Sequence, residues 1–159
     1  MDWDLSKKYI LFASTFDRIE KNSELAFQAL KIINDSNIEL VEFRNIKDEE
    51  IADYYAASDM LLLTSIREGS PQVIKEAMAM NIPIVSTDVG DVRDTIGNLE
   101  GSFITSFEPE DVAEKIRQAL KYGKNTNSRA ELKTLDNNYI TEKVISLYKE
   151  VLNLKMINN

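Results

Sequence analysis

The sequence contains no cysteine and no histidine among its 159 residues. Without cysteine it can form no disulfide bond, which fits a reducing compartment. The two absences also exclude zinc sites built from cysteine or histidine, together with every catalytic triad or general base that depends on histidine. Any proton transfer by this chain must therefore use carboxylates, lysine or tyrosine.

Long hydrophobic runs and an excess of positive charge are missing as well. No apolar run approaches the roughly 20 residues of a membrane span, and the N-terminus lacks the basic and apolar regions of a signal peptide, so we expect a cytoplasmic protein. Lysine plus arginine number 19 against 27 acidic residues, which gives a net charge of −8. This balance argues against nucleic acid as a partner. An anionic ligand must instead be held by a helix N-terminus or by a few placed cations.

Short apolar segments alternate with amphipathic ones along most of the chain. We expect strands at 9–13, 38–43, 60–65, 83–87 and 102–105, and helices at 23–33, 48–58, 71–80 and 109–122. Apolar strands without polar alternation predict a sheet that is buried on both faces and is therefore parallel. The predicted fold class is α/β: an open, doubly wound parallel sheet of Rossmann-like type in a single domain, with an extra C-terminal helix.

One domain is expected over residues 1–159, with its core at about 8–123 and a helical extension at about 126–155. The final helix of the extension, at 141–154, has an apolar stripe made by Val144, Leu147, Tyr148 and Val151. Right-handed crossovers place the loops that follow the strands along one edge of the sheet, where such folds bind ligands. We expect the functional site in the loops at 14–21, 44–48, 65–70 and 88–91.

The segment from Glu68 to Glu76 lies at this edge and contains a predicted helix start with a carboxylate at each end of the segment. Ser70 is a good N-cap, Pro71 suits the first helical position, and Gly69 permits a close backbone approach or a positive φ angle. The free N–H groups and the positive dipole end of such a helix suit a diphosphate. Carboxylates beside an anion site should serve hydroxyls, such as those of a ribose and a sugar. By spacing alone the pair has a simpler explanation, since acidic residues are favoured near helix N-termini.

The stretch 68–91, EGSPQVIKEAMAMNIPIVSTDVGD, resembles the C-terminal, donor-binding domain of retaining glycosyltransferases of family four. Enzymes of that family are of the GT-B type, with two Rossmann domains and a Glu-x7-Glu motif. The resemblance extends from about residue 9 to residue 120 and includes the segments 51–59 and 109–120. The in-register match downstream of the glutamate pair makes it much more specific than two glutamates eight residues apart.

The resemblance implies a role for each matching residue. Glu76 would hold the ribose hydroxyls of a nucleoside diphosphate, and Glu68 would act at the catalytic position beside the donor sugar. The diphosphate would lie on the backbone of the helix start, along Gly69, Ser70, Pro71, Gln72 and Val73. Lys21 matches the family's diphosphate-binding lysine, although a solvated surface lysine is an equal alternative. The base would lie near Arg44, Asn45 and Ile46.

Three positions depart from the family pattern. The usual Gly-Arg after the first strand is replaced by Ala13 and Ser14, which leaves Arg18 as a candidate substitute for the diphosphate-binding arginine. Asn81 replaces a glycine, but asparagine tolerates the left-handed conformation, so the turn can survive. Asp91 replaces the second glycine of a Gly-Gly pair.

The activity implied by the resemblance is transfer of a sugar from a UDP- or GDP-sugar to an acceptor, with retention and without metal or cofactor. The family's acceptor-binding N-terminal domain is missing from this sequence. We therefore expect an isolated domain that is inactive alone, with any peripheral membrane contact made by the missing half and a place in cell-surface polysaccharide synthesis. Two alternatives stay open: a non-catalytic nucleotide-binding or receiver-like module, with Asp88 as the nearest phosphoacceptor, and a degenerate subunit of a split transferase.

Overall fold

The computed structural model describes residues 3–124, 126–135 and 137–157. One five-stranded sheet runs through the domain in the order β2-β1-β3-β4-β5, and every strand pair is parallel. The strands are β1 (Lys8–Phe12), β2 (Ile38–Glu42), β3 (Met60–Leu63), β4 (Ile84–Thr87) and β5 (Phe103–Thr105). The parallel sheet and all five expected strands are thus confirmed.

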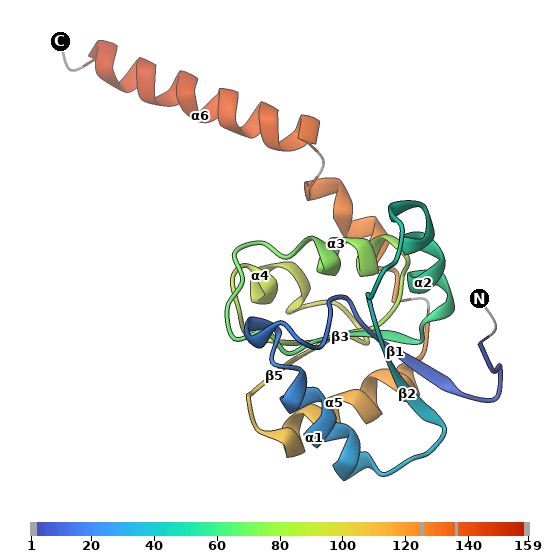
Figure 1. Ribbon diagram of the computed structural model, residues 1–159. Coiled ribbons are helices and arrows are strands. Elements are labelled where there is room, and N and C mark those ends of the chain that lie inside the picture. The colour runs from blue at the N-terminus through green and yellow to red at the C-terminus, as the bar shows by residue number, and fades with distance from the viewer. Residues whose placement is uncertain (1–2, 125, 136, 158–159) are drawn as a thin grey trace.

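Helices cover both faces of the sheet, as Figure 1 shows. On one face lie α1 (Ser23–Ile33) and α5 (Pro109–Tyr122); on the other lie α2 (Ile51–Ala57), α3 (Gln72–Ala79) and α4 (Val92–Ile96). Successive strand residues serve the two cores in turn, because Ile10 and Phe12 pack with α1 and α5 while Leu11 packs with α2, α3 and α4. The fold is therefore doubly wound, as the unalternated strands predicted.

The strand order places a switch point between β1 and β3. The chain passes from β1 outward to β2, then returns to build β3, β4 and β5 on the other side of β1. The chain therefore leaves β1 and β3 towards opposite faces of the sheet, and the region between the carboxyl ends of these strands, here called the crevice, is where folds of this kind bind ligands. This crevice brings the loop that contains Lys21 to the loop that contains Glu68.

Short helical segments account for most differences from the expected elements. The sequence did not predict α4, since five residues are too few for a helical period, although Val92 and Ile96 are both fully buried. Three 3-10 segments complete the domain: η1 (Ile19–Lys21), η2 (Asp48–Glu50) and η3 (Ser128–Leu135). The first of these shapes the end of the loop after β1.

The C-terminal extension begins against α3 and then leaves the domain. Ser128 in η3 donates a hydrogen bond to the Met78 carbonyl at 3.1 Å, and α6 (Asn137–Ile157) projects away from the sheet (Figure 1). The predicted apolar stripe is exposed at Val144, Leu147 and Tyr148, while the side chain of Val151 lies outside the described residues. Among the described residues no helix is both long enough and apolar enough to span a membrane.

The loop after β4 packs its backbone directly against the loop after β3. Gly90 has a φ of 57°, and a Cβ placed there would lie 2.0 Å from the Gly69 carbonyl oxygen. Next to it the Asp91 N–H donates a hydrogen bond to that same carbonyl at 3.0 Å. Gly69 itself is not among the glycines with positive φ, so the close approach depends on the missing side chain of Gly90.

Asn81 has a φ of 53°, which confirms that asparagine keeps the left-handed turn.

Gly90→Ala should therefore destabilise the domain by about 2 kcal/mol, because alanine is strained at this φ and meets the Gly69 carbonyl. Urea unfolding followed by circular dichroism measures the effect. Gly69→Ala is the matched control, since a Cβ at Gly69 has no atom within 4 Å. Equal stabilities for the two variants would contradict the proposed backbone contact.

Candidate functional site

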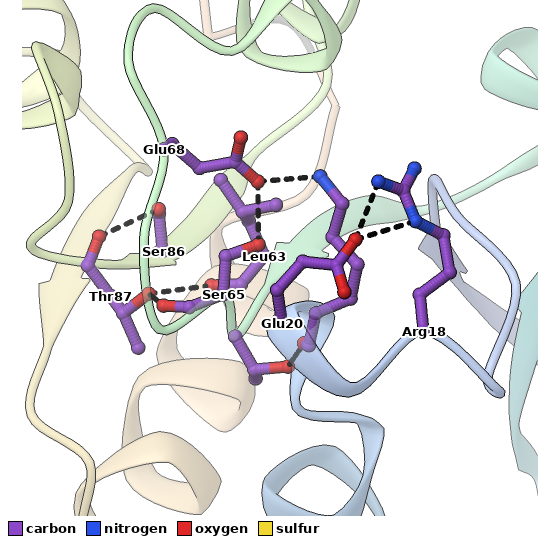
Figure 2. A network of polar contacts seen from close by, with 9 residues as sticks. Arg18, Glu20, Leu63, Ser65, Glu68, Ser86 and Thr87 are labelled. Atoms are coloured by element: carbon purple, nitrogen blue, oxygen red, sulfur yellow. Dashed lines mark hydrogen bonds and ion pairs between the residues drawn. The ribbon is translucent and has the colours of Figure 1, made fainter.

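An ion pair joins the loops that follow β1 and β3 at the crevice. The Lys21 ammonium lies 2.5 Å from Oε1 of Glu68, and the two side chains are only 13% and 15% exposed. The Ile66 N–H also donates to the Glu20 carbonyl at 2.9 Å, so backbone and side chains join the same two loops. Figure 2 shows Glu68 beside Ser65 at this junction, with Glu20 and Arg18 on the neighbouring loop. The interpretation of Lys21 as a solvated surface lysine is therefore wrong.

Helix α3 starts next to this ion pair, one residue later than expected. Its N-cap is Pro71 and makes no side-chain capping bond, so the prediction that Ser70 caps the helix is wrong. The Ser70 hydroxyl instead donates to Asp91 at 2.6 Å and accepts from the Lys75 ammonium at 2.8 Å. No capping side chain covers the first turn. The Ile74 N–H donates to the Pro71 carbonyl at 3.2 Å, which leaves the N–H groups of Gln72 and Val73 for an anion.

The open space at Gly69 lies in front of this helix start. Gly69 and Gln72 are exposed, Val73 is half-buried and Pro71 is buried. A side chain at Gly69 would meet no neighbouring atom within 4 Å. The arrangement leaves room for a ligand group directly against the backbone of the first turn.

Glu76 lies one turn along α3 and is held from behind by a buried tyrosine. The Tyr55 hydroxyl, on α2, donates to Oε2 of Glu76 at 2.8 Å and lies 3.3 Å from the Val73 carbonyl. Burial, followed by the hydrogen bond to Glu76, raises the pKa of Tyr55 well above its usual value. The phenol therefore stays a donor at neutral pH and fixes one oxygen of the carboxylate.

A pocket of about 340 Å³ opens between α2 and α3 beside this pair. Its walls are mainly apolar, with carboxylates at Asp48 and Glu76; the lining residues are Asp48, Ile51, Ala52, Tyr55, Glu76, Ala79 and Met80. Glu76 thus contributes a carboxylate to a pocket in which a partly apolar ligand can lie. A carboxylate with one fixed oxygen is a suitable acceptor for vicinal hydroxyls.

The two predicted arginines already have carboxylate partners. Arg18 is exposed and pairs with Glu20 at 2.5 Å, and Arg44 pairs with Glu42 at 2.6 Å. The hydrogen bond from Arg44 lowers the pKa of the Glu42 carboxyl. Within the described part of the chain no ion pair or hydrogen bond joins Arg18 or the 44–46 segment to Glu68 or Glu76.

Several side chains at the crevice were not singled out from the sequence. One is Tyr55, because nothing in the sequence pairs it with Glu76. Ser65 donates to Oε1 of Glu68 at 2.7 Å. Its signal in the sequence is the Ser-x-x-Glu spacing of Ser65 and Glu68, which resembles a capping box although no helix follows at once.

The receiver-like alternative lacks the acidic pocket that it requires. Asp88, its candidate phosphoacceptor, is exposed and accepts two hydrogen bonds from the Arg93 guanidinium, at 2.7 and 2.9 Å. No group of three acidic side chains that could hold a metal ion occurs in the part of the chain that the structure describes. The geometry of the site instead favours an anion at α3 and hydroxyls at the two glutamates.

Comparison with curated proteins points to the same class. Over 71 residues the chain is 34% identical to the putative teichuronic acid biosynthesis glycosyltransferase TuaC of Bacillus subtilis strain 168. The aligned region covers 45% of the chain and 18% of that protein. Over 173 residues it is 24% identical to N-acetyl-alpha-D-glucosaminyl L-malate synthase of Bacillus anthracis, covering 92% of the chain and 45% of that protein.

A solved structure with similar architecture is that of Anabaena HepE in complex with UDP and glucose, with a TM-score of 0.67 and 16% identity over 91% of the chain. This likeness supports the fold, and the chain spans about half the length, or less, of these three proteins. Residues 27–134, well over half of the chain, match the family described as "Glycosyl transferases group 1". The chain belongs to this glycosyltransferase family.

Proposed function

We propose that this chain is the donor-binding part of a glycosyltransferase and that it binds a nucleoside diphosphate sugar, with UDP or GDP as the nucleotide. The observation that carries the proposal is that three features lie one after another at the crevice and along α3. They are the Lys21–Glu68 ion pair, the start of α3 without a side-chain cap, and Glu76. Family membership supports the class of reaction. The UDP and glucose bound to the structurally similar HepE support the class of donor.

Each group serves one part of the donor in this proposal. The first-turn N–H groups of α3 and the Lys21 ammonium hold the diphosphate, with Arg18 as a further cation once it leaves Glu20. Glu76, steadied by Tyr55, accepts the ribose hydroxyls. Glu68 accepts hydroxyls of the donor sugar at the reacting end. The base lies towards Arg44, Asn45 and Ile46.

The chemistry proposed is transfer with retention and without a metal ion. As the bond between the sugar and the diphosphate breaks, negative charge grows on the departing phosphate. The helix N-terminus and Lys21 are placed before the reaction begins and stabilise that charge, which is the main electrostatic contribution available to the site. Retention and metal independence come from the family resemblance of the 68–91 segment.

The acceptor is proposed to bind to a second half that relatives possess, since this chain spans 45% of the length of its Bacillus anthracis relative. The isolated chain should then bind donor without transferring sugar. The name of the similar TuaC protein supports an acceptor in cell-surface polysaccharide synthesis. Any contact with a membrane would also come through that second half.

The first test is a thermal-shift panel of nucleoside diphosphates. UDP or GDP at ten times its Kd should raise the Tm by roughly 3–6 °C for a domain of this size. Glu76→Ala should abolish the rise, because the ribose loses its acceptor. Glu110→Ala, which removes an exposed glutamate from α5 on the opposite face of the sheet, is the matched control. No shift with any nucleoside diphosphate at millimolar concentration would contradict the proposed function.

A second test uses the carboxylate that faces the start of α3. Asp91 accepts the Ser70 hydrogen bond and adds negative charge beside the proposed diphosphate site. Asp91→Asn keeps an oxygen acceptor and removes the charge, so UDP should bind about fivefold more tightly by isothermal titration calorimetry. Asp94→Asn on α4 controls for the change in net charge. Weaker or unchanged binding in Asp91→Asn would place the diphosphate elsewhere.

A further inference from the structure

Buried hydroxyl groups lie beneath the ion pair at the ends of β3 and β4. Thr64, Ser65, Ser86 and Thr87 are all 0% exposed. Such groups are costly to bury unless each finds a partner. Figure 2 shows Ser65 bonded to Glu68 and to Thr87, and Ser86 next to Thr87. The hydrogen-bond partners of each hydroxyl show which of these residues contact Lys21 or Glu68.

Ser65 fixes the carboxylate of the pair. Its hydroxyl donates to Oε1 of Glu68 at 2.7 Å, the same oxygen that receives the Lys21 ammonium. Its own carbonyl accepts the Thr87 hydroxyl at 2.7 Å, which ties the backbone of Ser65 to β4. The direction of the Glu68 carboxylate is therefore set by the sheet beneath it.

Thr64 fixes the other partner through the backbone. Its hydroxyl donates to the backbone carbonyl oxygens of Lys21 and Asn22, each at 2.9 Å. Asn22 has a φ of 52°, so this is the point where the chain turns from η1 into α1. Holding these carbonyls sets where the Lys21 side chain departs from the loop.

We propose that Thr64 and Ser65 are positioning residues that hold Lys21 and Glu68 in a fixed relation across the crevice. The Thr64 hydroxyl thus orients the Lys21 cation through the backbone, and the hydroxyl of the next residue, Ser65, orients the Glu68 carboxylate. The benefit of this arrangement rests on the proposed function: a diphosphate and a sugar hydroxyl meet partners that are already in place, so less ordering is needed on binding.

Ser86 provides a matched control for the serine. It is as deeply buried as Ser65 and lies on the adjacent strand. Its hydroxyl donates to the Thr87 carbonyl at 2.9 Å, and among the described residues no hydrogen bond joins it to Lys21 or Glu68. A loss of stability common to buried serines will therefore appear in both alanine variants, whereas a loss of positioning will appear only at Ser65.

The test is the rate of acetylation of Lys21 in the full chain without nucleotide, measured by peptide mass spectrometry. Lys31, exposed on α1, is the internal reference in each sample. Ser65→Ala and Thr64→Val should each raise the Lys21 rate roughly fivefold, the effect of losing one hydrogen bond. Ser86→Ala and Thr64→Ser, which keeps the hydroxyl, should retain the wild-type rate. If Ser65→Ala does not fold, the two Thr64 variants decide the question.

A wild-type rate in folded Ser65→Ala and Thr64→Val, or an equal rise in Ser86→Ala, would overturn the proposal. Equal rates in Thr64→Val and Thr64→Ser would also overturn the role of Thr64. A separate arm adds UDP to the wild-type chain, where it should protect Lys21. Absence of protection would count against the proposed donor site while leaving the nucleotide-free comparison to decide whether Thr64 and Ser65 position the pair.

Discussion

The ion pair between Lys21 and Glu68 joins two loops that are 47 residues apart in the chain. It lies at the carboxyl ends of β1 and β3, where the order of the strands reverses and the loops after these two neighbouring strands meet. Both side chains are largely removed from water, a position that is costly for charges unless each has further partners. Glu68 meets this condition through the Ser65 hydroxyl. The site is therefore built on the strand order of the sheet.

The acidic character of the chain limits what kind of anion the site can hold. With a net charge of −8, the surface as a whole repels phosphates. Attraction must come from short-range elements, namely the first turn of α3 and the Lys21 ammonium. Asp91 opposes them with a negative charge, whereas the Lys75 ammonium, which donates to the same Ser70 hydroxyl, adds a positive charge nearby. A donor that carries hydroxyls at both ends of a diphosphate suits such a site better than a bare polyanion.

The sequence predicted the elements with strong local signals. Apolar runs such as Leu61–Leu63 identified the strands, and the helical patterns at 23–33 and 109–122 gave the bounds of α1 and α5. Interactions that depend on strand order were out of reach, because no local pattern places Lys21 beside Glu68 or Tyr55 beside Glu76. Ser70 failed as a predicted N-cap for a related reason: its hydroxyl is taken by Asp91, which comes from another loop. The ligand roles of all the site residues, from Lys21, Glu68 and Glu76 to Arg18 and the 44–46 segment, stay predictions.

The most direct measurement of the central claim is a crystal structure of the chain with UDP bound. The account predicts the diphosphate at the first turn of α3, the ribose hydroxyls on Glu76, and the Lys21 ammonium within hydrogen-bond distance of a phosphate oxygen. Glu68 should keep its bond from Ser65. UDP bound away from this crevice, or a Lys21 that remains wholly paired with Glu68 while the nucleotide is present, would contradict the account.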